Sequence, residues 1–205
     1  MRLGRPAVTA LVLAGGAASR MGGSKADRRL GGRSLLEHSL SLADAVADEV
    51  LLLPGGRALP AEAAGRRCVA DWAPGGDGPL AALGAGLEAA RHAWCLLLPC
   101  DMPWLRADVA RRLVERTADA TEELVAVRGP AGWEPFFALY RTTLAARARA
   151  ELAAGRRSLV GLIERSAALA VAPEELSDLD PQLRSLRNLN TLAELEAAAR
   201  AECAS

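Results

Sequence analysis

Short apolar runs alternate with longer amphipathic segments through the first two thirds of the chain. The runs cover residues 8–14, 49–53, 67–70, 94–99 and 123–127. They are apolar throughout and do not alternate with polar residues, which predicts strands covered on both faces. Their regular alternation with helix-like segments predicts successive βαβ units. We therefore expect an α/β fold with a mostly parallel central sheet and helices on both faces.

Capping signals mark where the first and last helices begin. Ser34 followed by Glu37 forms a capping box ahead of an apolar stripe, and Thr191 with Glu194 forms another. The second box predicts a closing helix from Leu192 onward. The other expected elements are a helix from Pro79, helices over 107–117 and 142–152, and a late strand over 135–140.

Composition narrows the class of ligand. The 205 residues suffice for one domain, so we assign residues 1–205 to a single unit. Twenty-five basic side chains balance 25 acidic ones, and aromatic residues make up 3%, which disfavours nucleic acid and membrane partners. No apolar stretch resembles a membrane span or signal segment, so we expect a cytoplasmic protein. Cys68 and Cys95 lie in apolar runs and are expected to be small core residues.

A glycine-rich segment with two cations follows the first apolar run directly. Arg20 and Lys25 lie in this segment, and its four glycines are Gly15, Gly16, Gly22 and Gly23. Glycines let backbone N–H groups approach phosphate oxygens, and the two cations supply positive charge. The alternative is a flexible loop with solvated cations. The spacing fits neither a dinucleotide-binding fingerprint nor a P-loop, so we expect a different kind of phosphate site.

Two acidic residues stand at the ends of apolar runs. Asp101 follows the run over 94–99, and Pro103 prevents an immediate helix. Ligands bind at the carboxyl ends of parallel strands, and a carboxylate there can hold Mg²⁺ together with substrate phosphates. The alternative role for Asp101 is to cap a turn. Asp71 ends an earlier run and is expected to touch the ligand or a metal-bound water, whereas Asp77 suits a turn.

Four motifs together resemble the molybdenum cofactor guanylyltransferase family of MobA-like nucleotidyltransferases. Residues 13–25 resemble the family's Leu-Ala-Gly-Gly, Arg-Met-Gly, Lys signature, and residues 99–103 its metal-binding strand end. Residues 78–87 are similar to its central loop and helix, and residues 188–191 to its late Asn-x-Asn-Thr element. The motifs occur in the family's order and span nearly the whole chain. Ser24 and residues 54–56 depart from the family pattern.

The resemblance implies a Rossmann-like fold, GTP and molybdopterin (or molybdenum cofactor) as substrates, and Mg²⁺ as the metal. The acceptor phosphate would attack the α-phosphorus of GTP and release pyrophosphate, with Asp101 on the metal. By position, the nucleotide contacts would be Leu13, Ala14, Gly15 and Asp71, the phosphate contact Lys25, and the acceptor side Asn188 and Asn190. The charge of Arg20 predicts a further phosphate contact beside Lys25. Gly16 ends a Leu-Ala-Gly-Gly stretch, where cytidylyl relatives tend to carry Leu-Ala-Ala-Gly, and this difference favours guanine.

Several alternatives stay open at this point. One is a cytidylyl- or sugar-1-phosphate nucleotidyltransferase on the same scaffold. Another is a GTP-binding protein without turnover that hands the cofactor to an apoenzyme, and transient contact with cofactor-handling proteins or molybdoenzymes is compatible with either role. Asn188 and Asn190 would otherwise serve the cap at Thr191. The segment Arg156-Arg157-Ser158 would either hold an acceptor phosphate or begin a helix.

Overall fold

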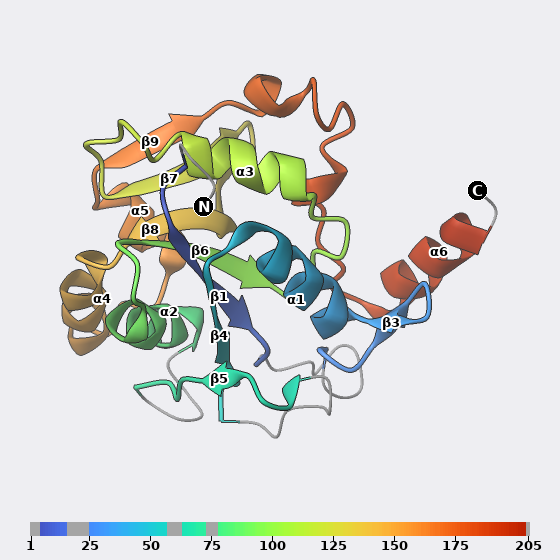
Figure 1. Ribbon diagram of the computed structural model, residues 1–205, viewed down its shortest axis with the longest axis horizontal. Helices are drawn as coiled ribbons and strands as arrows, with labels where there is room; N and C mark the ends of the chain where they lie inside the picture. The colour runs from blue at the N-terminus through green and yellow to red at the C-terminus, as the bar shows by residue number, and fades with distance from the viewer. Residues whose placement is uncertain (1–4, 16–24, 57–62, 73–77, 204–205) are drawn as a thin grey trace.

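The computed structural model describes residues 5–15, 25–56, 63–72 and 78–203, and a seven-stranded sheet runs through its centre (Figure 1). The strand order is β5-β4-β1-β6-β8-β7-β9. In chain order the strands are β1 (Val8–Leu13), β4 (Glu49–Leu53), β5 (Arg67–Cys68), β6 (Trp94–Pro99), β7 (Leu124–Gly129), β8 (Gly132–Arg141) and β9 (Ala168–Val171). β8 runs antiparallel to both of its neighbours, and the remaining pairs are parallel. The predicted mostly parallel sheet is confirmed.

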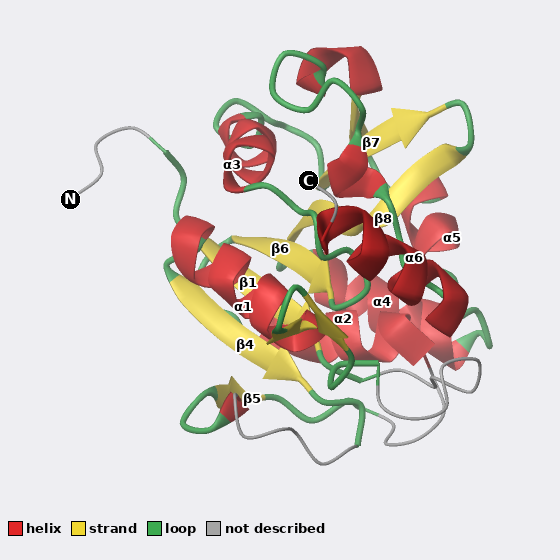
Figure 2. Cartoon of the chain, turned by 90° about the vertical axis from the view of Figure 1, so that its right-hand side faces the viewer, coloured by secondary structure: helices red, strands yellow, loops and turns green. Residues whose placement is uncertain are grey.

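Helices cover both faces of this sheet, as Figures 1 and 2 show. They are α1 (Leu35–Val46), α2 (Gly78–Ala89), α3 (Ala107–Glu115), α4 (Leu144–Ala153), α5 (Leu159–Glu164) and α6 (Leu192–Cys203). Val12 packs into a core with α1 and α3, and its neighbour Leu13 packs into a second core with α2, α4 and α5. Successive residues of a strand point to opposite faces, so each face of the sheet forms its own core.

The predicted helix starts agree with the observed ones. Ser34 caps α1, and its side chain accepts from the backbone N–H of Glu37 while the Glu37 carboxylate accepts from Ser34 N–H. Thr191 and Glu194 make the same reciprocal pair ahead of α6. α2 begins one residue before the expected Pro79, at Gly78, whose φ of 69° favours glycine. Both capping boxes are confirmed.

Some elements differ from expectation. β8 begins three residues before the expected strand, and β9 and the hairpin of β2 (Arg29–Leu30) with β3 (Arg33–Ser34) were not predicted. Cys95 is buried as expected, but the expectation for Cys68 is wrong, because this residue lies on the short edge strand β5 and is exposed. Within the described residues, every helix is too short or too polar to cross a bilayer.

Candidate active site

A cleft of about 670 Å³ opens at the carboxyl ends of the central parallel strands. β1 lies between β4 and β6, and the residues that follow all three strands line the cleft. The first turn of α2 borders it through Gly78, Pro79 and Ala82. A helix N-terminus favours anions because its first N–H groups lack partners within the helix. The cleft therefore lies where an open parallel sheet binds ligands.

An ion pair between residues 76 positions apart lies in this cleft. The Lys25 ammonium donates to Oδ2 of Asp101 at 2.6 Å, and each side chain keeps 22% of its surface exposed. Lys25 also donates to Oδ1 of Asn190 at 3.3 Å. The backbone N–H of Leu189 donates to the carbonyl of Asp101 at 2.8 Å, and this bond holds the segment before α6 against the end of β6. The structure thus brings Lys25, Asp101 and Asn190 together.

The end of β6 is fixed by two hydrogen bonds from buried side chains. The thiol of Cys100 donates to the carbonyl of Leu13 at 2.8 Å, and Ser39 Oγ donates to the carbonyl of Pro99 at 2.8 Å. Burial raises the pKa of Cys100 to about 12, so this residue stays a neutral thiol. These contacts hold the ends of β1 and β6 side by side, and they orient the Asp101 backbone toward the cleft.

Gly15 owes its identity to packing in this structure. A Cβ atom there would lie 2.7 Å from the carbonyl oxygen of Pro54 and 2.8 Å from Cα of Gly55. The backbone N–H groups of Ala14 and Gly15 both donate to the carbonyl of Leu53, at 3.0 and 3.2 Å. The N–H of Gly15 is therefore engaged within the sheet, which corrects the expectation that it is directed at phosphate. Gly16, Gly22, Gly23 and Arg20 lie outside the described residues.

Asp71 reaches the cleft from the segment after β5. Its Oδ1 atom is buried, and no described residue donates a hydrogen bond to it. Burial raises the pKa of this carboxyl group. A buried acceptor without a donor is costly in a folded protein, and hydroxyl or amine groups of a ligand in the cleft would supply one.

The neighbour of Asp71 is clamped from two helices. The indole N–H of Trp72 donates to Glu88 on α2 at 2.9 Å, and the guanidinium of Arg149 on α4 lies 4.0 Å from the ring centroid. Gly84 on α2 provides room for this ring, because a Cβ atom there would collide with it. The clamp fixes the position of Asp71 at the cleft, and we did not predict it because its members are distant in sequence.

Two residues at the start of β8 were also missed. Phe136 lines the cleft, and its N–H donates to Oε1 of Glu134 at 3.0 Å. The pairing of β8 with β6 ends at Ala138, opposite Leu97, and Glu134 pairs with Val127 on β7. Burial, and secondarily the charge of Asp101, raises the pKa of Glu134. The glutamate at the start of an apolar strand was the signal that could have identified it.

Comparisons with known proteins agree with this geometry. Residues 10–170 match the MobA-like NTP transferase domain family. The chain belongs to this family. The protein is thus an enzyme of the nucleotidyltransferase class. It is 37% identical to the molybdenum cofactor guanylyltransferase of Burkholderia lata, over 95% of this chain and 97% of that protein.

Solved structures show the same MobA-like fold. The molybdopterin-guanine dinucleotide biosynthesis protein A of Archaeoglobus fulgidus has a TM-score of 0.82 at 22% identity, and the match covers 96% of this chain and 100% of that one. A manganese complex of Rv0371C from Mycobacterium tuberculosis has a TM-score of 0.61 at 16% identity, with coverage of 95% and 98%. These likenesses establish the fold of this MobA-like chain.

The donors of this MobA-like cleft suit a magnesium ion. Mg²⁺ binds oxygen ligands, keeps several waters and needs only one or two protein carboxylates when phosphates complete its shell. Asp101 supplies a carboxylate at the cleft, and its charge acts on the carboxyl group of Glu134 on β8. No group of three or more His, Cys, Asp or Glu residues that could hold a metal occurs in the described part of the chain. The residues present therefore fit a metal that is shared with a phosphate ligand.

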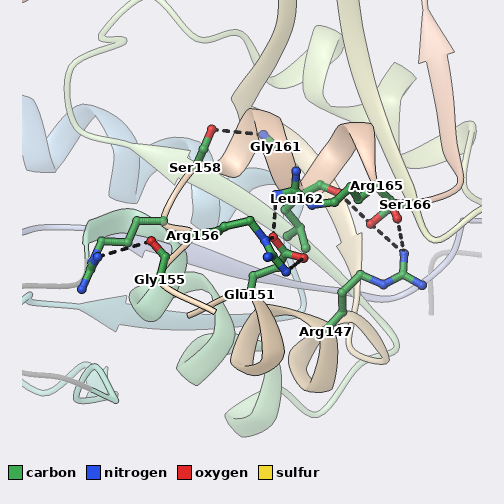
Figure 3. Close-up of polar contacts among 10 residues, drawn as sticks. Arg147, Glu151, Gly155, Arg156, Ser158, Gly161, Leu162, Arg165 and Ser166 are labelled. Atoms are coloured by element: carbon green, nitrogen blue, oxygen red, sulfur yellow. Dashed lines mark hydrogen bonds and ion pairs between the residues drawn. The ribbon is translucent and has the colours of Figure 1, made fainter. Parts of the chain in front are cut away.

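The basic segment at residues 156–158 has a structural role in this MobA-like chain. Figure 3 shows Arg156 and Arg165 converging on the Glu151 carboxylate, and Arg156 donates to both of its oxygens, at 2.7 and 3.0 Å. Ser158 caps α5 by accepting from Gly161 N–H at 3.1 Å. Of the two interpretations, the structure supports the helix start, and none of these residues lines the cleft.

Proposed function

We propose that this protein transfers GMP from GTP to molybdopterin, with release of pyrophosphate and with Mg²⁺ as the metal. The observation that carries the proposal is the Lys25–Asp101 pair, at 2.6 Å, in a cleft at the carboxyl ends of the strands. The curated relative that is 37% identical along 95% of the chain bears the name molybdenum cofactor guanylyltransferase, which supports the choice of base and acceptor.

The chemistry requires positioning and charge neutralisation, and no covalent enzyme intermediate. An oxygen of the acceptor phosphate forms a bond to the α-phosphorus, and the bond to the β-phosphate oxygen breaks as pyrophosphate leaves with the electron pair. Asp101 would hold the metal, which supplies charge neutralisation on the phosphates when it is bound. Lys25 would donate to phosphate oxygens as their charge grows, and we propose the same role for Arg20.

The remaining contacts divide between the two substrates. Leu13, Ala14 and Gly15 would lie against the nucleotide, because they line the same cleft as Lys25. The buried acceptor atom of Asp71 would receive a hydrogen bond from the nucleotide's sugar or base. Asn190 would lie on the acceptor side, since it already touches Lys25. The Leu-Ala-Gly-Gly stretch that ends at Gly16 favours guanine as the base.

An NTP panel tests the proposal. The purified protein would be incubated under anaerobic conditions with molybdopterin, Mg²⁺ and each of GTP, CTP, ATP and UTP, and pyrophosphate release would be measured. We expect release with GTP, together with a guanine dinucleotide product that is detected by mass spectrometry. Equal rates with GTP and CTP would contradict the choice of base. Mg²⁺-dependent GTP binding without pyrophosphate would favour a handover protein.

A further inference from the structure

A second groove, of about 740 Å³, lies between α6 and the segment that precedes it. Trp104, Arg184, Arg187, Asn188 and Glu194 are among the residues that line it. None of these residues lines the cleft that holds Lys25 and Asp101. The groove therefore has its own set of side chains, and their chemistry is cationic and aromatic.

Two arginines of this groove lie against one tryptophan. Arg184 begins the 3-10 helix η3 (Arg184–Leu186), and Arg187, whose backbone is extended, follows this helix directly. The guanidiniums of Arg184 and Arg187 lie 5.3 and 5.8 Å from the ring centroid of Trp104. The N–H donors of a guanidinium lie at the edge of its plane, so a guanidinium that stacks on an aromatic ring can still donate to a ligand.

The backbone around these arginines is fixed. The buried carboxylate of Asp180 accepts from the N–H of Ser185 at 2.7 Å, and Ser185 Oγ donates to the carbonyl of Trp104 at 3.3 Å. These bonds fasten η3 to the segment that follows Asp101. The arginines thus start from a positioned backbone, which lowers the entropy that a ligand must overcome when it binds them.

The lining of the groove carries a net positive charge, because two arginines stand against one glutamate. Many arginines elsewhere in this protein pair with a carboxylate, as Arg66 does with Asp44 at 2.6 Å. No described carboxylate pairs with the side chain of Arg184 or Arg187. Glu194 also lines the groove, but its Oε2 atom accepts from the N–H groups of Asn190 and Thr191, at 2.6 and 3.0 Å. The groove is therefore suited to an anion.

The groove and the cleft share a wall. Asn188 lines the groove, Asn190 contacts Lys25 in the cleft, and Leu189 between them donates to the Asp101 carbonyl. Trp104 follows Asp101 by three residues. A ligand whose phosphate lies at Asp101 would extend along this wall into the groove, provided that the ligand is long enough.

We propose that this groove binds the part of the acceptor that is remote from its phosphate, as a flat nitrogen heterocycle with anionic substituents. The proposal deepens and rests on the proposed function. Molybdopterin has this form, since a reduced pterin with a flat pyrimidinone ring and two anionic sulfur atoms follow its phosphate. Arg184 and Arg187 donate to the anionic groups, and the guanidinium planes and Trp104 provide stacking surfaces. These three residues then determine acceptor specificity and leave GTP binding unaffected.

Kinetics with arginine variants test this assignment. The variants are the double substitution R184A/R187A, the charge-keeping R184K/R187K, and the matched control Arg128→Ala. Arg128 also stacks on a tryptophan, at 5.0 Å from the ring centroid of Trp133, and lies outside the groove. KM for molybdopterin would be measured at saturating GTP, and KM for GTP at saturating molybdopterin, with thermal unfolding of each variant as a check of folding.

We expect R184A/R187A to raise the acceptor KM by about 100-fold, on the order of tenfold for each lost charge-assisted contact. KM for GTP should change by less than about threefold, and the control should match the parent in both constants. The lysine variant should recover part of the acceptor affinity, because it keeps the charge and loses the planar fork. An acceptor KM within about threefold of the parent in R184A/R187A would overturn the assignment.

Direct binding separates this proposal from the proposed function. If the parent protein releases no pyrophosphate with any nucleotide, the proposed function fails. Equilibrium dialysis of molybdopterin against the parent and R184A/R187A then decides about the groove alone. Binding that is lost in the variant supports the groove as an acceptor site. Equal binding by both proteins, or no binding by the parent, refutes it.

Discussion

Replacing Asp101 with asparagine distinguishes a catalytic carboxylate from a structural one. The change keeps the size of the side chain and removes its charge. If the ion pair with Lys25 served only to fasten the chain, stability and activity would fall together. If Asp101 holds a metal at the triphosphate, activity would fall far more than stability.

The structure sets the expected magnitudes. Each partner of the Lys25–Asp101 pair keeps 22% of its side chain exposed, so water screens part of their attraction. We expect the free energy of unfolding to fall by less than about 2 kcal/mol, since exposed pairs contribute roughly 0.2–1 kcal/mol. Loss of one preorganised electrostatic contact to a transition state costs about 10²–10³ in kcat, and we expect a fall of this size at saturating Mg²⁺.

The assay combines pyrophosphate release over a range of Mg²⁺ concentrations with urea denaturation. The matched control is Asp44→Asn, because Asp44 also forms an ion pair at 2.6 Å, with Arg66, but lies on the surface of α1, away from the cleft. The control should lose little stability and no activity. Near-normal turnover of Asp101→Asn at saturating Mg²⁺ would refute the metal-holding role.

Two further predictions concern stability. Arg156 and Arg165 lower the pKa of Glu151 from 4.5 to about 2. The stabilisation that the Glu151 carboxylate provides is therefore complete above pH 4.5 and is lost as pH falls toward 2. Urea denaturation across this range should show a shallower pH dependence for Glu151→Gln than for the parent, and identical slopes would contradict the prediction. Gly15→Ala should lower the free energy of unfolding by about 1–3 kcal/mol and weaken GTP binding in calorimetry, since its Cβ would overlap Pro54 and Gly55. Gly129→Ala is the control, because its Cβ would meet only a proline side chain at 3.4 Å, and equal losses in both variants would refute the packing argument.

The residues that follow parallel strands could be identified from the sequence. The carboxyl ends of parallel strands meet at one edge of a sheet, so the sequence predicts that Lys25, Asp71 and Asp101 share a site. All three line the same cleft in the structure. Their chemical roles stay predictions, as does the assignment of residues 1–205 to one domain.

The direction of β8 explains why Glu134, near its amino end, was not predicted from the sequence. In a parallel strand the residues before the apolar run lie at the edge opposite the ligand, so Glu134 was not considered. β8 runs antiparallel to β6, and this reversal brings its amino end to the carboxyl end of β6. Strand direction depends on pairing with distant strands, and the local sequence of an apolar strand does not encode it.

The sequence by itself determined which segments form helices and strands, and at which strand ends the ligand binds. It could do so because apolar periodicity, capping residues and glycine act over a few neighbouring positions. Only the tertiary structure decided which distant residues meet. It joined Lys25 to Asp101, clamped Trp72 between two helices, and placed Arg184 and Arg187 against Trp104. Such contacts depend on how the strands and helices pack, and packing is a property of the whole chain that no local pattern records.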